Sequence, residues 1–516
     1  MSNHGFVIDQ RKCIGCHACT VACKAENEVP VGVFRTWVKY IEKGEFPNTR
    51  RHFSVMRCNH CADAPCVAIC PTKALYVRHD GIVDFDNRRC IGCKSCMAAC
   101  PYEAIYIDPD EHTAAKCNYC AHRVDVGLQP ACVLVCPVQA IVSGDLDDPA
   151  STISRLVARE PVRARKPEQG TRPKLFYLGA DEASLVPETV RQPEQYIWSE
   201  VHPWEHDKLA LLGGSASHGP GRTECSAGEA RVAYNVAHEK PWERLVSAYL
   251  WTKSIAAGVL VLAGALLGLG LFTSDPVLAV AAPAISLVFL GLTTVFLLAD
   301  LGKPRRFLYI LTKPNFSSWL VWGSYILILF GATGALWLAA WLGDMPALLH
   351  ALVWPAVVLG VLAAIYSGFL FGQAEARDFW QTPLLPIHLF VQSAAAGAAA
   401  LLLVEAPLGG ALVQPLSAVL AGALLLHLVL VLAEIVVPHS NLMVAQSSEL
   451  IVRGPYARPF WVIALLGGVA LPLALLASAA AVAAPAQPVA AGVLALLGLL
   501  VYEDIWVQAG QAVPLS

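Results

Sequence analysis

Charged residues are scarce in this sequence. Asp, Glu, Lys and Arg make up 15% of its 516 residues, hydrophobic residues make up 56%, and the formal net charge is only −3. A chain without a basic surplus has no electrostatic basis for binding nucleic acid, so we exclude nucleic acid as a partner. So little charge beside so much apolar material also excludes a fully soluble protein and indicates a membrane segment.

Long apolar runs are missing from residues 1–240 and dominate residues 245–516. A helix needs about 20 apolar residues to cross a bilayer, and helices are expected because each segment must satisfy its own backbone polar groups. The sequence therefore predicts an all-α polytopic membrane bundle of eight transmembrane helices. The runs lie at about 247–272, 277–299, 319–342, 347–372, 384–404, 411–437, 460–482 and 487–507.

Basic residues are almost absent after Lys253. The seven that remain are Lys303, Arg305, Arg306, Lys313, Arg377, Arg453 and Arg458. Eight helices would place all seven in loops on the side of the N-terminal domain. The positive-inside rule assigns that side to the cytoplasm, which predicts a multi-pass protein of the inner (cytoplasmic) membrane. Residues 1–12 do not resemble a secretory signal, but export of the folded domain with a signal-bearing partner is the alternative.

Cysteine is nearly absent after residue 136, because sixteen of the 17 cysteines lie in four runs before that point. The first and third runs have the spacing Cys-x2-Cys-x2-Cys-x3-Cys, and the second and fourth widen one gap. This is the pattern of ferredoxins with two 4Fe-4S clusters, in which three thiolates bind one cluster and the fourth binds the other. The runs are Cys13, Cys16, Cys19, Cys23; Cys58, Cys61, Cys66, Cys70; Cys90, Cys93, Cys96, Cys100; and Cys117, Cys120, Cys132, Cys136.

Zinc ribbons and disulfide frameworks are the other uses of dense cysteine. Zinc sites contain two Cys pairs, and disulfides need an oxidising compartment, so neither suits four such runs. Cys225 has no ligand spacing, and we expect it to be a spectator thiol.

The cysteine-rich segment is internally duplicated. Residues 9–16 match residues 86–93, and short apolar runs near the motifs predict strands at Phe6–Ile8, Ala74–Val77, Ile82–Phe85 and Ala104–Ile107. We therefore predict an α+β ferredoxin-like double (pseudo-twofold) domain over residues 1–180. A linker and pre-helix segment is expected over 181–244, followed by the membrane domain over 245–516.

The exchange of fourth cysteines predicts the ligand sets. The second and third runs are close in sequence and should exchange with each other, which leaves the first and fourth as the other pair. The sets are Cys13, Cys16, Cys19, Cys136; Cys117, Cys120, Cys132, Cys23; Cys58, Cys61, Cys66, Cys100; and Cys90, Cys93, Cys96, Cys70.

The order of the runs, the wide gap in the fourth and the segment Pro173-Lys-Leu-Phe-Tyr177 resemble four-cluster iron–sulfur subunits of dimethyl sulfoxide, polysulfide and tetrathionate reductases. This resemblance covers about residues 4–180. It implies four 4Fe-4S clusters, because every ligand position is Cys. It also implies a separate catalytic subunit of molybdopterin type.

Residues 232–516 resemble NrfD-like, polysulfide-reductase-type membrane subunits. The resemblance is carried by residues 234–242, 249–253, 300–307 and 509–516. It implies a site for menaquinone or ubiquinone at the end of the bundle nearest the iron–sulfur domain, where ionisable residues gather and are functional candidates. The expected quinone residues are Asn235, His238, Asp300, Arg305 and Tyr366.

We therefore expect an electron-transfer and membrane-anchor subunit that links the quinone pool with a catalytic subunit and has no substrate site of its own. The alternative is a redox-coupled ion-translocating module fed by a ferredoxin or hydrogenase. Haem ligation is not expected, since His350, His388 and His427 are predicted at different depths in the membrane.

Overall fold

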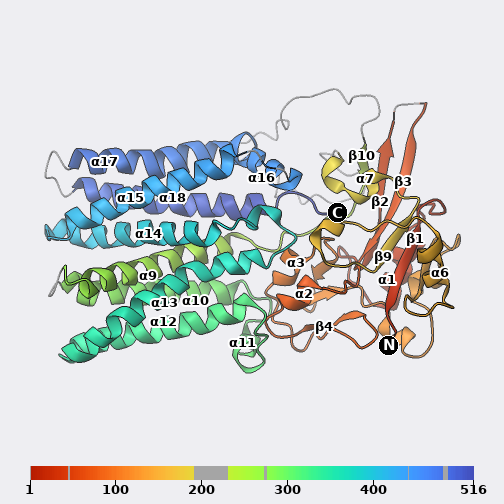
Figure 1. Cartoon of the computed structure of the whole chain (residues 1–516), viewed down its shortest axis with the longest axis horizontal. Helices are drawn as coiled ribbons and strands as arrows, with labels where there is room; N and C mark the ends of the chain where they lie inside the picture. Colours follow the sequence, from red (N-terminus) through yellow and green to blue (C-terminus); the bar gives the residue numbers. More distant parts are fainter. Residues whose placement is uncertain are drawn as a thin grey trace.

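The structure is a computed structural model that describes residues 2–44, 47–190, 230–271, 276–437, 439, 441–479 and 486–516. A domain of short strands and helices lies at one end of a bundle of long helices (Figure 1). This confirms the predicted order of a ferredoxin-like region followed by a helical membrane domain.

The first sheet of the N-terminal domain is built on β1 (His4–Asp9). β8 (Ile141–Asp145) pairs antiparallel on one side of β1, and β9 (Leu175–Leu178) pairs parallel on the other. Three successive apolar residues of β1 are buried because both faces of the sheet are covered. The strand β9 therefore brings residues 175–178 into the same sheet as the start of the chain.

A second sheet has the order β10-β2-β3, from Arg231–Tyr234, Thr36–Lys43 and Arg50–Arg57. β10 lies inside the segment that we predicted to be a linker, residues 181–244. That segment therefore contributes a strand to the N-terminal domain. The Gly-rich stretch 213–221 and Cys225 lie outside the described residues.

Two hairpins carry the predicted short strands. They are β4–β5 (Leu75–Val77 and Val83–Phe85) and β6–β7 (Ile105–Ile107 and Ala114–Lys116). The helices of the domain are mostly single turns, and several carry cysteines of the runs. They are α1 Ala18–Glu26, α2 Pro65–Ala68, α3 Ser95–Ala99, α4 Ala121–Val124, α5 Ala131–Leu134, α6 Thr152–Arg159 and α7 Glu182–Leu185, with single 3-10 turns at Pro167–Gln169 and Pro187–Thr189.

The described residues contain eight helices long and apolar enough to span a membrane, as predicted. Two of them include π-helical stretches, at Val277–Ala281 and Pro459–Ala470. The spans are α9 Arg244–Gly268, α10 Val277–Ala299 with its π turn, α12 Trp319–Leu342, α13 Pro346–Gly372, α14 Leu385–Leu408, α15 Val413–Val436, α17 Pro459–Ala479 with its π stretch, and α18 Ala486–Gly510. Shorter helices α11 (Tyr309–Thr312) and α16 (Leu442–Val452) lie between spans.

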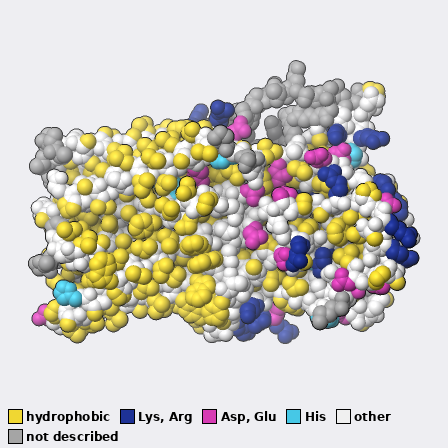
Figure 2. Space-filling model, in the orientation of Figure 1, with side chains coloured by type: hydrophobic (Ala, Val, Ile, Leu, Met, Phe, Trp, Pro, Cys, Tyr) yellow, Lys and Arg dark blue, Asp and Glu magenta, His cyan; other side chains and the backbone are white. Residues whose placement is uncertain are grey.

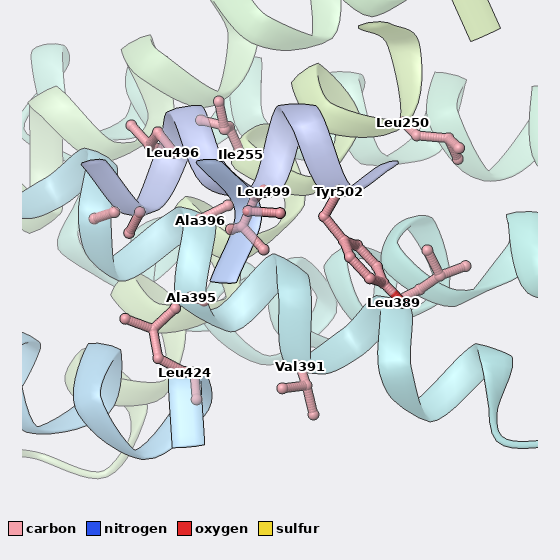
Figure 3. Packing of buried hydrophobic residues seen from close by; sticks show 14 of the residues in the cluster. Leu250, Ile255, Leu389, Val391, Ala395, Ala396, Leu424, Leu496, Leu499 and Tyr502 are labelled. Atoms are coloured by element: carbon pink, nitrogen blue, oxygen red, sulfur yellow. The ribbon is translucent and has the colours of Figure 1, made fainter. Parts of the chain in front are cut away.

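The core of the bundle is formed by α9, α14 and α18. Leucine, alanine and valine side chains from these helices interlock in Figure 3. α9 and α14 approach most closely at Gly258, where an added Cβ would overlap the backbone of Ser393 and Gly397. The outer helices instead present apolar side chains on the surface seen in Figure 2, as lipid contact requires.

Three loops at one end of the bundle contact the N-terminal domain. Lys303 N–H donates to the carbonyl of Ile91, Arg377 pairs with Glu103, and Gln446 donates to the carbonyl of Glu188. These loops contain all seven basic residues that follow Lys253. On the face shown in Figure 2, Lys and Arg likewise lie only toward this end and over the N-terminal domain.

Candidate functional site

Three of the four predicted cysteine sets each line one enclosed space in the N-terminal domain. The sets are Cys58, Cys61, Cys66, Cys100; Cys70, Cys90, Cys93, Cys96; and Cys23, Cys117, Cys120, Cys132. In the remaining set, Cys13 lies near Cys16 and Cys136, and Cys19 lies near Cys13. The structure thus brings together the members of each set proposed from the spacing, including the exchanged fourth cysteines.

The duplicated runs share one backbone conformation. Gly15 and Gly92, which precede the second cysteine of their runs, have positive φ angles of 68° and 71°. His17 and Lys94, which follow that cysteine, have φ angles of 58° and 60° and begin α1 and α3. Glycine suits the first position because only a residue without Cβ adopts positive φ without strain. The turn directs successive thiols to one side, as the ligands of a cluster require.

The arrangement of thiols does not suit a single zinc ion. Among the described residues, no three Cys, His, Asp or Glu side chains lie close enough to share one metal ion. Zinc needs four ligands at about 2.3 Å from one centre, whereas a 4Fe-4S cluster spreads four thiolates over four irons. The sixteen described cysteines also form no disulfide. The donor sets therefore fit iron–sulfur clusters.

Hydrogen-bond donors point at the cysteine sulfurs. The guanidinium of Arg57, which is fully buried, donates to Cys132 Sγ at 3.0 Å. Backbone N–H groups of Ala114 and Ala140 donate to Cys90 Sγ at 3.4 Å and Cys136 Sγ at 3.2 Å. Such donors stabilise anionic sulfur and tune the reduction potential of a bound cluster.

Burial opposes ionisation of the cysteine thiols. It raises the pKa of Cys61 and of Cys93 to about 12 and that of Cys100 to about 11. A thiol must lose its proton to bind iron, so binding of a cluster releases protons. The bonds between sulfur and iron offset the free-energy cost of burying the thiolates.

The four sets form a line through the domain. Cys96 lies near Cys66 of the next set, Cys117 lies near Cys58, and Cys19 lies near Cys132. The set of Cys70, Cys90, Cys93 and Cys96 is at the membrane end, since Asn315 donates to the Cys70 carbonyl at 2.8 Å and Arg306 donates to the Cys90 carbonyl at 3.1 Å. At the other end, Cys16 is exposed to solvent.

Exposed aliphatic side chains lie beside the cysteines of this outer set in the sequence. Ile14 lies between Cys13 and Cys16, and Val21 lies on α1, where they are 55% and 65% exposed. α5, which packs on α1, adds Leu134 and Val135. We call these four residues the outer apolar patch.

The structure separates the predicted quinone residues into groups. Asn235 is buried at the interface, where its Oδ1 accepts a hydrogen bond of 3.1 Å from Trp37 Nε1. The ring of His238 lies 5.0 Å from that of Trp37, and its Nε2 is buried without a partner among the described residues. These two residues therefore lie together.

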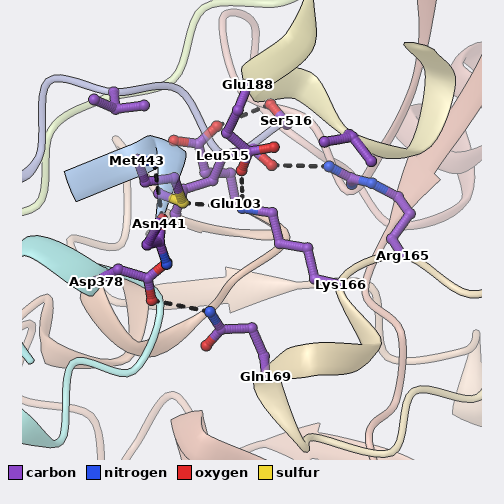
Figure 4. Close-up of polar contacts among 12 residues, drawn as sticks. Glu103, Arg165, Lys166, Gln169, Glu188, Asp378, Asn441, Met443, Leu515 and Ser516 are labelled. Carbon is purple, nitrogen blue, oxygen red and sulfur yellow. Dashed lines mark hydrogen bonds and ion pairs between the residues drawn. The ribbon is translucent and has the colours of Figure 1, made fainter. Parts of the chain in front are cut away.

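A buried polar network lies beside them that the sequence did not predict (Figure 4). Glu103 faces His238, pairs with Arg377 at 3.4 Å, and accepts a hydrogen bond of 2.8 Å from Ser516 Oγ. Lys166 pairs with Glu188 at 2.8 Å nearby. The position of Glu103 directly after Cys100-Pro-Tyr was its only signal in the sequence.

Asp300 forms the second group. It ends α10, and its carboxylate accepts a hydrogen bond of 3.2 Å from Lys94 of the third cysteine run. Arg305, which we expect in the same site from the sequence, is exposed, and the cation that pairs with Asp300 is Lys94. The pair joins the membrane-end cysteine set directly to the bundle.

Tyr366 forms the third group, inside the bundle. Its ring packs against Gly323, and Lys253 Nζ lies 4.9 Å from the ring centroid. Tyr249 lies within electrostatic range of both Tyr366 and Asp300, so it connects the second and third groups.

The structure corrects our expectation for two histidines. His388 and His427, predicted at different depths, lie side by side with Nε2 and Nδ1 2.8 Å apart. The two axial ligands of a haem lie on opposite faces of the macrocycle, whereas these two nitrogens are within hydrogen-bond distance of each other. They form a hydrogen-bonded pair and not a haem site in this arrangement.

Comparison with known proteins gives matches in both halves. Residues 233–514 match the family model described as polysulphide reductase, NrfD, and residues 12–75 and 50–146 match 4Fe-4S dicluster domains. The sequence is 44% identical over 202 residues to a subunit of tetrathionate reductase from Salmonella typhimurium, covering 38% of this chain and 80% of that protein. It is 44% identical over 180 residues to a component of polysulfide reductase from Wolinella succinogenes, covering 34% of this chain and 93% of that protein.

Proposed function

Because this protein belongs to the polysulphide reductase NrfD family and, in its N-terminal part, to the family of iron–sulfur subunits that includes the one from Salmonella tetrathionate reductase, we propose that it carries electrons between the quinone pool and a separate catalytic subunit. The catalytic subunit would be of molybdopterin type. The quinone would be menaquinone or ubiquinone.

The line of four cysteine sets is the observation that carries this proposal. It runs from Cys70 and Cys90, against the bundle, to the exposed Cys16 at the opposite end. Each set would hold one 4Fe-4S cluster, and a bound cluster accepts or gives one electron at a time. The chain's own part is to hold neighbouring sets close, to shield the inner sets from water and to aim N–H donors at the sulfurs.

The catalytic subunit would dock on the outer apolar patch. These four aliphatic side chains lie in the sequence beside cysteines of the set with the exposed cysteine. An apolar patch at that point would exclude water from the contact and bring a partner's redox centre close to the outermost set.

The quinone headgroup would bind between the bundle and the membrane-end set. Asp300 and Tyr366 lie on the bundle side of this region, and Asn235 and His238 lie at the same interface. His238 carries an unpartnered Nε2 that can donate to a quinone carbonyl. Arg305, being exposed, would act at most on the approach of the headgroup.

The orientation of the protein in the membrane follows from the basic residues in its loops. All seven late basic residues lie in loops at the iron–sulfur end, so the positive-inside rule would place that domain in the cytoplasm and the bundle in the inner membrane.

Quinol oxidation by the purified protein tests the proposal. With a quinol analogue as donor, His238→Ala should lose reduction of the clusters while dithionite still reduces them and their EPR spectra stay normal. His350→Ala, an exposed histidine in α13 at the far end of the bundle, is the matched control and should react like the wild type. Quinol reduction at the wild-type rate in His238→Ala would place the site elsewhere.

The alternative is an ion-translocating module fed by a ferredoxin or hydrogenase. It draws support from the buried ionisable residues in the bundle, including Lys253 and Glu503. Purification in mild detergent distinguishes the two functions. A molybdopterin enzyme that copurifies with the protein would support the proposed function, and a copurifying hydrogenase would support the alternative.

A further inference from the structure

Several buried polar side chains in the bundle lack hydrogen-bond partners. Ser254 of α9, Gln392 and Ser393 of α14, and Glu503 of α18 are each at most 3% exposed. Among the described residues, no donor or acceptor reaches Ser254 Oγ, Gln392 Oε1, Ser393 Oγ or either carboxylate oxygen of Glu503.

These side chains belong to the three helices that form the core of the bundle. α9 and α14 touch where Gly258 meets the backbone of Ser393, one turn along α9 from Ser254. Glu503 of α18 lies near both Lys253 and Ser254, but no contact has the geometry of a hydrogen bond to its carboxylate oxygens. Ser254, Ser393 and Glu503 therefore lie in the region where α9, α14 and α18 meet, and Gln392 is next to Ser393 in α14.

Their surroundings are apolar. Leu389, Leu499 and Ile255 belong to the packed core of the same three helices (Figure 3). A polar atom buried in such a core without a partner is strongly unfavourable, and nearly all buried polar atoms in proteins are paired with protein or with ordered water. Five unpaired oxygens in one helical core indicate bound molecules that supply the missing hydrogen bonds, and water is small enough to do so.

Lys253 connects the region of these unpaired oxygens to Tyr366. Its Nζ donates to the Ala364 carbonyl at 3.0 Å and to Ser367 Oγ at 2.9 Å, and it lies over the Tyr366 ring. Lys253 is also within electrostatic range of the Glu503 carboxyl, and no ion pair between the two is formed among the described residues. A gap between an ammonium and a carboxyl of this kind is filled by bridging water.

We propose that Ser254, Gln392, Ser393 and Glu503 enclose an internal water site that joins Glu503 to Lys253. Resting on the proposed function, we assign this water a role in moving protons between Glu503 and the quinone site at Tyr366. His388, His427, Tyr502 and Glu434 form a separate polar group on neighbouring faces of α14, α15 and α18.

The stability of Ser393→Ala tests the hydration. If water binds Ser393, removing its hydroxyl costs a hydrogen bond and lowers the melting temperature of the purified protein. If the site is dry, the same change removes an unpaired polar group and raises the melting temperature, which would overturn the proposal. Ser324→Ala, whose hydroxyl bonds within its own helix, corrects for the general effect of alanine in a span.

Infrared spectroscopy tests the water directly. The wild-type protein should show an internal-water stretching band that shifts in H₂¹⁸O and is lost in Glu503→Met. The band should persist in Glu434→Met, whose carboxyl already bonds to Tyr502 and Trp506. A spectrum without such a band would overturn the water site whatever the quinone chemistry.

The proton role has its own test. Glu503→Gln keeps the shape and the water but cannot carry a proton, so quinol reduction of the clusters should slow on the order of 100-fold. Dithionite reduction should stay normal. An unchanged quinol rate with the water band intact would overturn the proton role alone, and failure of His238→Ala to block quinol would instead count against the quinone site.

Discussion

The backbone N–H of Gly302 donates a hydrogen bond of 3.2 Å to the carbonyl oxygen of Gly92. Gly92 lies between Cys90 and Cys93, and Gly302 lies just after α10, so this bond joins the two domains beside the membrane-end cysteine set. A Cβ on Gly92 would lie 2.8 Å from the Gly302 backbone and 2.7 Å from the His112 carbonyl oxygen. The domains can approach this closely only because both residues lack a side chain.

Gly302→Ala should therefore loosen the interface. The added methyl overlaps the backbone of His112, and such overpacking typically costs about 1–3 kcal/mol. We expect a lower melting temperature, followed by loss of visible cluster absorbance, and slower reduction by quinol. Gly291→Ala in α10, where an added Cβ meets nothing within 4 Å, is the control and should melt at or above the wild-type temperature. Equal melting temperatures of the two variants would show that Gly302 is not in close contact with the backbone of His112.

Iron content should follow the cysteine sets. Four intact sets predict about sixteen irons per chain, and Cys16→Ser should reduce this to about twelve or convert one cluster to a 3Fe form. Chemical analysis of iron and sulfide with EPR of the reduced protein measures both values. Because Cys16 belongs to the outermost set, reduction of the other clusters by quinol should survive. About eight irons in the wild type would contradict the assignment of four clusters.

Lys39 should make stability depend on pH. Burial in β2, together with the nearby Arg165, lowers the pKa of Lys39 to about 7. The unfolded chain keeps the proton up to the ordinary lysine range, so stability should rise with pH above about 7, by about 2 kcal/mol between pH 7 and 9. Thermal melting at the two pH values should show this rise in the wild type.

Lys39→Met should remove that difference and raise the melting temperature at pH 7. Lys43→Met, at the exposed end of the same strand, should leave the difference unchanged. A pH effect that persists in Lys39→Met would assign it to another group.

Reporter fusions should reveal the orientation. A reporter that is active only in the cytoplasm should work when inserted after Gly454, in a loop at the iron–sulfur end, and fail when inserted after Asp344, in the loop between α12 and α13 at the other end. The reverse result would support export of the folded domain with a partner.

The fold was predictable where the sequence is periodic or repeated. Eight apolar runs correspond to eight spans, with ends that differ by up to four residues, since the bilayer imposes length and composition on each helix. The short strands β4 to β6 followed from apolar runs beside the cysteines. β10 was missed because a single strand after residues 191–229, which lie outside the described part, pairs with a partner about 190 residues earlier.

The candidate site was only partly predictable. Cysteine spacing led to sets that the structure brings together, because a cluster fixes its ligands by short local turns and one exchange. Lys94 and Glu103 were missed because each lies within three residues of a cysteine and looks like an ordinary surface charge in the sequence. Their partners, Asp300 and Arg377, come from the other domain, so no local pattern contains the pair.

The two domains are parts of one chain, and their contacts are close-fitting, as at Gly92 and Gly302. Separate subunits must find each other, and dilution shifts them toward the dissociated state. A covalent connection keeps the partner at an effective concentration on the order of millimolar, whatever the dilution. Detergent extraction and dilution will therefore leave every bundle with its own set of redox centres. Only cleavage of the peptide chain would separate the membrane domain from the cysteine sets.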